Sequence, residues 1–270
     1  MGGNPAQQAR SASFTRRAVT AAITVAAIVS VATISVAQRA SANPSTQAIT
    51  LNTGGNWTEG FDYTNTAAAV YLDSQGVVHL EGAVDQLGAS GSDLIGWLPA
   101  DFPNRTVYTI VHTFDGTYAD IDIRPDGQIW LYRTANVNTA FVSLEGVTYS
   151  QGADHGIPLS SNWTGIENTD SSHPSYGAAD PGFSIDREGV VHLSGAVRQL
   201  NPESGVQQIG TVGEAPSSDV YTIVHTLGGT YADLTINTLG QIWLIPSSNT
   251  NTNFVSLEGV TYVASPPYRL

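Results

Sequence analysis

Aromatic, carboxylate and amide side chains alternate along two predicted strands, and the same set returns later in the chain. Tyr118 and Asp120 lie on one strand, and Gln128 and Trp130 lie on the next. An aromatic ring can cover the apolar face of a sugar, while carboxylate and amide groups bond to its hydroxyls. We therefore predict a ligand-binding face on each copy, although a tryptophan in a strand can also pack into the core. The equivalent residues of the second copy are Tyr231, Asp233, Gln241 and Trp243.

Four histidines also lie on predicted strands. His79 and His192 share the phrase GVVHL-x-GAV, and His112 and His225 share YTIVHT. Together, His79 and His112 could bind a metal or provide a general base. No further ligand follows at a recognisable spacing, so we expect His79 and His192 to be hydrogen-bonded within a sheet. His112 and His225 share a strand face with apolar neighbours, which predicts partial burial.

The sequence offers only weak motifs for catalysis or metal binding. Ser143 could form a Ser–His–Asp set with His112 and Asp120, but Val-Ser-Leu reads as ordinary strand alternation rather than a strained nucleophile turn. Turn carboxylates such as Asp73 and Asp126 could hold calcium, yet the chain has no Asp-x-Asp-x-Asp-Gly loop. We therefore predict no catalytic residue, no metal site and no cofactor.

These candidate residues belong to a long internal duplication. Motifs between residues 76 and 149 match motifs between residues 189 and 262 at a constant offset of 113. A constant offset means that no net insertion separates the matched motifs. The front of the repeat differs, because Trp57 matches Trp163 at an offset of 106. Copy two therefore has seven more residues there, which we place in a loop at 167–181.

The elements that carry these residues are predicted to be β-strands. Short runs rich in Val, Ile, Thr and Tyr alternate with turns such as Pro125-Asp126-Gly127, and the pattern of an amphipathic helix is missing. Three such runs, at 106–113, 117–123 and 128–132, predict a three-stranded meander with short glycine-containing loops. About six to eight strands in each copy are typical of a β-sandwich or jelly roll. The sequence thus predicts an all-β protein with two tandem β-sandwich (jelly-roll-like) modules, at residues 47–150 and 156–265.

The first 42 residues differ in kind from the two modules. Arg16 and Arg17 precede an apolar run at 18–37, which leads to Ala40-Ser41-Ala42. A basic start, an apolar middle and a small-x-small end are typical of an export signal, and the paired arginines hint at twin-arginine export. We predict a signal peptide at 1–42 and a secreted mature chain that is not membrane-bound. The alternative is an uncleaved segment that anchors the protein in a membrane.

Charge and cysteine content restrict the partners of the mature chain. Six of the ten basic residues and all 23 acidic residues follow residue 42, which leaves a mature net charge of −17. Such a surface disfavours nucleic acid, because phosphate contacts need Lys and Arg, and it repels anionic membranes. The absence of cysteine excludes disulfides and thiolate metal sites.

The order of the motifs resembles that of a known group of modules. Trp57, Tyr71 and Asp73 precede the GVVHL phrase, which is followed by Ile-Gly-x-Leu-Pro at 95–99 and by Val-Ser-Leu-x-Gly-Val-x-Tyr at 142–149. This pattern resembles the C-terminal receptor-binding or head modules of phage tail-fibre and baseplate proteins. It is also similar to related modules of exported actinobacterial proteins. The resemblance covers nearly all of both copies.

The resemblance implies a jelly-roll-like sandwich that binds a cell-surface component, often as a trimer, and it does not imply catalysis. Copy two departs from the pattern, because residues 209–212 lack the counterpart of Leu98-Pro99. The leading hypothesis is an exported, non-catalytic protein that binds a surface glycan or another envelope component. One alternative is a structural protein that forms homo-oligomers through its repeated modules. Another is a glycan-active enzyme, which would need paired carboxylates across a cleft.

Overall fold

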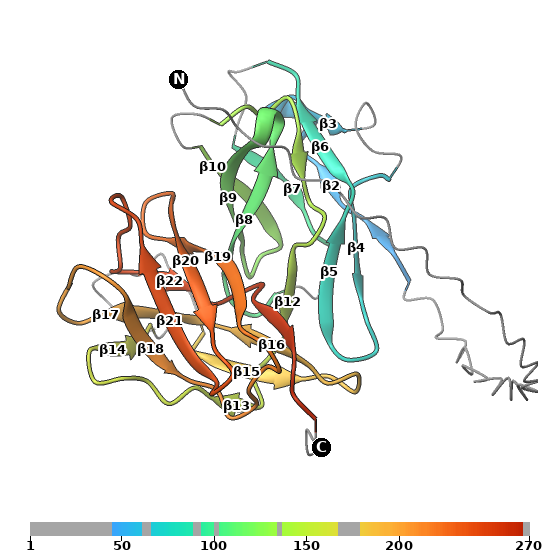
Figure 1. Cartoon of the computed structure of the whole chain (residues 1–270). Coiled ribbons are helices and arrows are strands. Elements are labelled where there is room, and N and C mark those ends of the chain that lie inside the picture. Colours follow the sequence, from blue (N-terminus) through green and yellow to red (C-terminus); the bar gives the residue numbers. More distant parts are fainter. Residues whose placement is uncertain are drawn as a thin grey trace, which may run out of the picture. The chain divides into compact units, whose positions relative to one another are not determined.

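The computed structural model describes residues 45–60, 66–88, 93–99, 103–133, 137–166 and 179–266. The predicted signal segment at 1–42 and most of the predicted loop at 167–181 lie outside these residues. The described chain is all-β, as predicted, and its helical turns are the short 3-10 segments η1 (Thr53–Gly55) and η2 (Phe114–Gly116) (Figure 1). Within the described ranges, no helix has the length and apolar character needed to span a bilayer.

The first module contains two antiparallel sheets. The centre of the larger sheet is the meander predicted from the sequence, and it carries the first set of candidate ligand-binding residues. Its strands are β8 (Val107–Thr113), β9 (Thr117–Ile123) and β10 (Gln128–Tyr132). The smaller sheet has the order β1 (Gln47–Ala48), β4 (Ala69–Leu72), β5 (Val77–Glu81) and β12 (Thr148–Ser150). The larger sheet has the order β2 (Thr50–Leu51), β7 (Leu94–Trp97), β10 (Gln128–Tyr132), β9 (Thr117–Ile123), β8 (Val107–Thr113), β11 (Val142–Ser143), β6 (Ala83–Gln86) and β3 (Trp57–Glu59).

The larger sheet curls until its two edges meet. Its edge strands β2 and β3 are joined by η1, so they are neighbours along the chain although they lie at opposite ends of the strand order. The Asn52 N–H donates to Ile95 O of β7 at 2.8 Å, and the Trp57 N–H donates to Asn52 O at 3.3 Å. The sheet is therefore nearly closed, like a barrel, which leaves less of its edge unpaired than in an open sheet.

The second module repeats this arrangement strand for strand. Its larger sheet lacks only a counterpart of β2, which is replaced by a single bridge between Leu159 and Gly210. The shared order confirms that the two copies have one framework. The smaller sheet has the order β13 (His155–Gly156), β15 (Gly182–Ile185), β16 (Val190–Ser194) and β23 (Thr261–Val263). The larger has the order β14 (Trp163–Gly165), β17 (Ala196–Gln199), β22 (Val255–Ser256), β19 (Val220–Thr226), β20 (Thr230–Ile236), β21 (Gln241–Pro246) and β18 (Gln207–Thr211).

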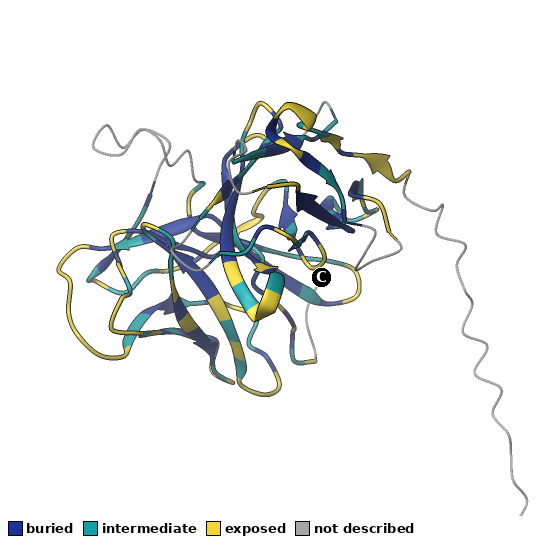
Figure 2. Ribbon diagram, turned by 90° about the horizontal axis from the view of Figure 1, so that it is seen from above, coloured by how far each residue is buried: buried dark blue, intermediate teal, exposed yellow. Residues whose placement is uncertain are grey.

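Side-chain alternation builds one core in each module. In β5, Val78 and Leu80 are buried, whereas His79 between them points to the opposite face. The larger sheet adds residues such as Ile121 and Ile129 to the same buried cluster. The second module has an equivalent cluster, and buried and exposed residues can be seen to alternate along the strands in Figure 2.

The backbone requires the glycine that ends the GVVHL-x-G phrase. Gly82 and Gly195 have φ values of 83° and 82°. A Cβ would lie 2.4 Å from Ala67 O at the first position and 2.3 Å from Asp180 O at the second. Only glycine fits both this left-handed conformation and this close approach. The repeated phrase is therefore a strand and the glycine corner that leads to the next strand.

The two modules pack against each other within one compact unit, Ser41–Leu270. Tyr108 of the first module forms a small buried cluster with Ile166, Ala196 and Phe254 of the second. The Ser256 hydroxyl also donates to Tyr108 O at 2.7 Å. This junction brings β8 of the first module against β19 and β22 of the second.

Candidate functional site

The outer face of the meander carries the predicted residues of the first module. Tyr118 is half exposed, while Gln128 and Trp130 are partly buried. The Trp130 indole N–H donates to Gln128 Oε1 at 2.6 Å. Trp130 pairs with Asp122 across the ladder, four residues beyond Tyr118. Tyr118 and Trp130 are therefore about 13 Å apart along the strand direction and do not enclose one sugar ring between them.

Asp120 does not lie on the exposed part of this face. It is 3% exposed and points to the second module, where its Oδ1 lies 3.0 Å from Nδ1 of His225. This contact is close but does not have the angles of an aligned hydrogen bond, and Asp120 Oδ2 has no hydrogen-bond partner among the described residues. The alternation predicted from the sequence is present, but packing between the modules covers this carboxylate.

The second module leaves the equivalent face open. Tyr231 and Asp233 are exposed on β20, and Gln241 and Trp243 are partly buried on β21. The four side chains share one face of the sheet, as predicted. Gln208 of the edge strand β18 pairs with Trp243 and extends the polar part of this face. Their role in ligand binding stays a prediction.

A charged and aromatic network on the first module was missed by the sequence analysis. Asp122 Oδ2 accepts from Arg124 Nε at 3.1 Å and from the Tyr132 hydroxyl at 3.2 Å. The Arg124 guanidinium lies 4.6 Å from the centre of the Trp130 ring, which is cation–π geometry. The same positions in copy two are Thr235, Asn237 and Ile245. Their joint change between the copies is the signal that could have identified the network.

Burial and charge shift the ionisation of this network. Burial raises the pKa of Asp122, and its bonds to Arg124 and Tyr132 offset only part of that effect. Burial also raises the pKa of Tyr132, and the nearby Asp122 carboxylate raises it further. Burial acts to lower the pKa of Arg124, but the Asp122 carboxylate outweighs it and the pKa is raised. The guanidinium therefore stays charged beside the indole ring.

A cavity of about 390 Å³ lies at the junction of the modules, next to this network. The volume falls in the range of small-ligand pockets. Tyr108 of β8 and Tyr132 of β10 supply aromatic walls, and Arg133 and His225 supply polar ones. The β19–β20 turn at 227–229 supplies the remaining wall, where two glycines expose the backbone.

The polar side chains that line this junction pocket, Arg133 and His225, are positioned by contacts with neighbouring residues. The Arg133 guanidinium donates through Nε to Asp93 Oδ1 at 2.6 Å and through Nη2 to Gln86 Oε1. The His225 imidazole stacks on the Tyr108 ring at 5.6 Å and contacts the Asp120 carboxylate. The pocket thus combines rigid rings with a positioned cation and an acid–imidazole pair.

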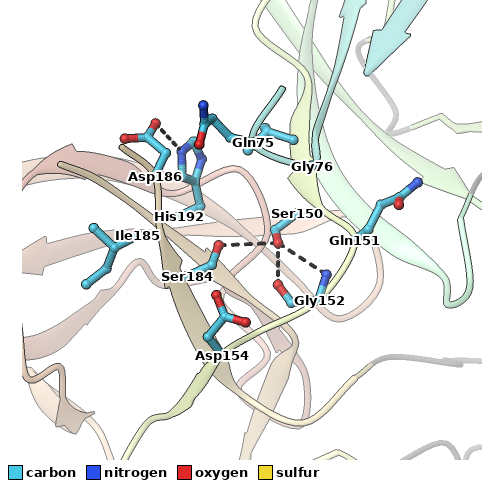
Figure 3. Close-up of a pocket in the computed structure, with 11 residues that line it drawn as sticks. Gln75, Gly76, Ser150, Gln151, Gly152, Asp154, Ser184, Ile185, Asp186 and His192 are labelled. Carbon is cyan, nitrogen blue, oxygen red and sulfur yellow. Dashed lines mark hydrogen bonds and ion pairs between the residues drawn. The ribbon is translucent and has the colours of Figure 1, made fainter. Parts of the chain in front are cut away.

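A smaller cavity of about 170 Å³ lies between the β4–β5 turn of module 1 and strands β15 and β16 of module 2 (Figure 3). His192 Nε2 lies 3.1 Å from Asp186 Oδ2 on its wall, and Ser150 and Ser184 are 3.3 Å apart. His79 and Asp73 form the same pair at 3.0 Å in the first copy. The prediction that His79 and His192 are hydrogen-bonded within the sheet is therefore confirmed.

The Ser–His–Asp set and the metal site that the sequence analysis did not favour find little geometric support among the described residues. Ser143 Oγ accepts from the Glu145 N–H at 3.2 Å within a turn, and the Asp120 carboxylate contacts His225 rather than His112. In the part of the chain that the structure describes, no three His, Asp or Glu side chains are grouped as a metal site.

The likeness to phage tail-fibre and baseplate modules rests on the motif order and stays a prediction. Comparisons of the chain with protein-family models, with curated proteins and with solved structures found no match.

Proposed function

We propose that this chain is an exported, non-catalytic binding protein that recognises a surface glycan or a similar polyhydroxylated envelope component. The observation that carries the proposal is the junction pocket, which places two tyrosine rings beside Arg133 and His225 in a cavity of about 390 Å³. Export rests on the signal predicted at 1–42.

The chemistry of the pocket suits a sugar. The Tyr132 ring, which is 44% exposed, offers a flat apolar surface for the C–H face of a pyranose, while the covered Tyr108 ring forms part of the apolar wall. The Arg133 guanidinium and the backbone of Gly228 and Gly229 offer donors and acceptors for hydroxyl or carboxylate substituents.

The proposal is tested by capturing glycans with residues 43–270 on a glycan array. We expect retained binding, and Tyr132→Ala should weaken it by about tenfold, because one aromatic contact is worth roughly 1.4 kcal/mol. Ile245→Ala is the matched control, since Ile245 occupies the position of Tyr132 in the second copy. Failure of the intact chain to retain any glycan, or equal losses in the two variants, would count against the proposal.

A further inference from the structure

The junction between the modules joins two unlike surfaces. The first module contributes a sheet face, which we define by Tyr108 and Asp120. The second contributes an edge surface, defined by His225, Phe254, Ser256 and Glu258. The Tyr108 ring stacks on His225 at 5.6 Å and meets Phe254 edge-on at 4.9 Å. Two further contacts are the Asp120–His225 contact at 3.0 Å and the bond from Ser256 Oγ to Tyr108 O at 2.7 Å.

The duplication supplies each of these surfaces a second time. At the offset of 113, Tyr108 and Asp120 correspond to Tyr221 and Asp233, so the second module also carries a sheet face. The first module likewise carries an edge surface, because all four residues of that surface keep their identity there. These counterparts are His112, Phe141, Ser143 and Glu145.

Among the residues that the structure describes, the second sheet face and the first edge surface are largely exposed rather than packed against another module. Tyr221 is 73% exposed, whereas Tyr108 is 6% exposed. Asp233 is exposed beside Ile223, which is also exposed. On the edge surface His112 and Glu145 are exposed, and Phe141 and Ser143 are half-buried. The same residue types are therefore covered at the junction and uncovered elsewhere.

We infer that a second copy of this chain covers them. The edge surface of one copy, centred on His112 and Phe141, would dock on the sheet face of the next, centred on Tyr221 and Asp233. The contact would repeat the ring contacts of Tyr with His and Phe, the Asp–His contact and the Ser–Tyr bond of the junction, with each of these residues meeting the same residue type. It joins unlike surfaces and leaves one of each exposed at the two ends. Such a head-to-tail contact grows into a ring if its rotation closes and into a filament if it does not.

One contact of the junction has no equivalent between copies. Arg105 donates to Glu258 at 3.0 and 3.2 Å, and both side chains are buried. The counterpart of Arg105 is Ser218, which is exposed, while Glu145 takes the place of Glu258. The contact between copies therefore lacks the buried ion pair. It also joins two separate chains, whereas the modules at the junction are covalently linked. We therefore expect it to be weaker than the junction and to depend on protein concentration.

Sedimentation velocity on residues 43–270 over a concentration series tests this inference. We expect reversible self-association, which Tyr221→Arg should weaken by at least about tenfold, because central aromatic contacts dominate interfaces. Ser218→Arg should strengthen it severalfold by restoring a partner for Glu145, and adding Glu145→Gln should cancel that gain. Ser204→Arg is the control, because it adds the same charge at an exposed site in another loop.

Mixing two blocked chains tests the head-to-tail geometry. Tyr221→Arg blocks the sheet face of the second module, and His112→Glu blocks the edge surface of the first. Each variant should therefore stay monomeric alone. Their mixture should form a one-to-one complex that grows no further. A chain that is monomeric at every concentration, variants that still self-associate alone, or equal effects of Ser218→Arg and Ser204→Arg would overturn the inference. Circular dichroism of each variant confirms that the exposed substitutions leave the fold intact.

Discussion

Tyr108 and Tyr221 occupy the same place in the two copies, yet one is buried and the other is largely exposed. The difference does not come from the neighbours along the chain, because both lie in the phrase VYTIVHT. It comes from the second module, whose His225 and Phe254 cover Tyr108. At the scale of single residues, the residue type sets which functional groups are present, and packing between modules decides whether they are exposed to solvent.

The buried pair of Arg105 and Glu258 gives a prediction at this scale. Both Glu258 and its counterpart Glu145 accept a backbone N–H from the glycine corner, Gly195 and Gly82 respectively. Only Glu258 also neutralises a buried arginine. We expect Glu258→Ala to lower the free energy of unfolding by about 3–5 kcal/mol, because it leaves a buried charge unpaired.

The matched variant Glu145→Ala should cost only about 0.5–1.5 kcal/mol, because it removes one hydrogen bond at an exposed site. Urea unfolding of both variants, followed by tryptophan fluorescence, measures the two losses. Similar losses would mean that the Arg105–Glu258 pair does not stabilise the junction.

At the scale of elements, much of the meander could be predicted from the sequence. Strands were expected at 106–113, 117–123 and 128–132, and the structure has Val107–Thr113, Thr117–Ile123 and Gln128–Tyr132. Runs of β-branched residues predict the strands, and glycine-containing turns predict their ends. Both features are local in the sequence, so no long-range contact is needed to identify them. The strand order and the closure of the larger sheets were not predicted, because they depend on contacts between segments far apart in the chain.

The turn before β5 shows how a local element is held together. Asp73 accepts from the N–H groups of Gln75 and Val77 at 2.8 and 3.0 Å and pairs with His79 at 3.0 Å. Burial acts to raise the pKa of Asp73, but these bonds outweigh it, and the pKa is lowered. The folded state then binds the proton less tightly than the unfolded state, so the carboxylate stabilises the fold above its ordinary pKa.

We therefore expect Asp73→Asn to lower the free energy of unfolding by about 1 kcal/mol at pH 7, a value reduced for partial exposure. The difference from the unmodified chain should shrink as the pH falls through the lowered pKa of Asp73, because the natural carboxylate is then protonated as well. Thermal unfolding from pH 7 to pH 2 checks this. Asp126→Asn is the control, since Asp126 caps a similar turn without a histidine. A difference that is constant with pH would contradict the prediction.

At the scale of the whole molecule, the candidate site arises from the pairing of two modules. Tyr118, Gln128 and Trp130 were placed on one face from alternation alone, and the structure keeps them there. The burial of Asp120 could not be predicted, because the residue that contacts its carboxylate, His225, belongs to the second module. The junction pocket was missed for the same reason, since its walls come from strands about 100 residues apart in the chain.

The pocket also explains why the copies differ where they do. Tyr132 and Arg133, which line it, correspond to Ile245 and Pro246 in the second copy. The sheet face of the second module keeps Tyr221 and Asp233, the counterparts of Tyr108 and Asp120, but has Ile245 and Pro246 where the first module has the pocket residues. Under our two proposals, the first copy contributes the ligand pocket and the second contacts another chain.

The most direct test of ligand recognition is to map the bound glycan onto the chain. Isotope-labelled residues 43–270 would be titrated with the glycan retained most strongly on the array, and backbone amide shifts would be followed by NMR. The account predicts saturable shift changes at Arg133, Gly228 and Gly229, which line the junction pocket. Changes confined to Tyr231 and Trp243 on the second module, or no saturable change at all, would contradict it.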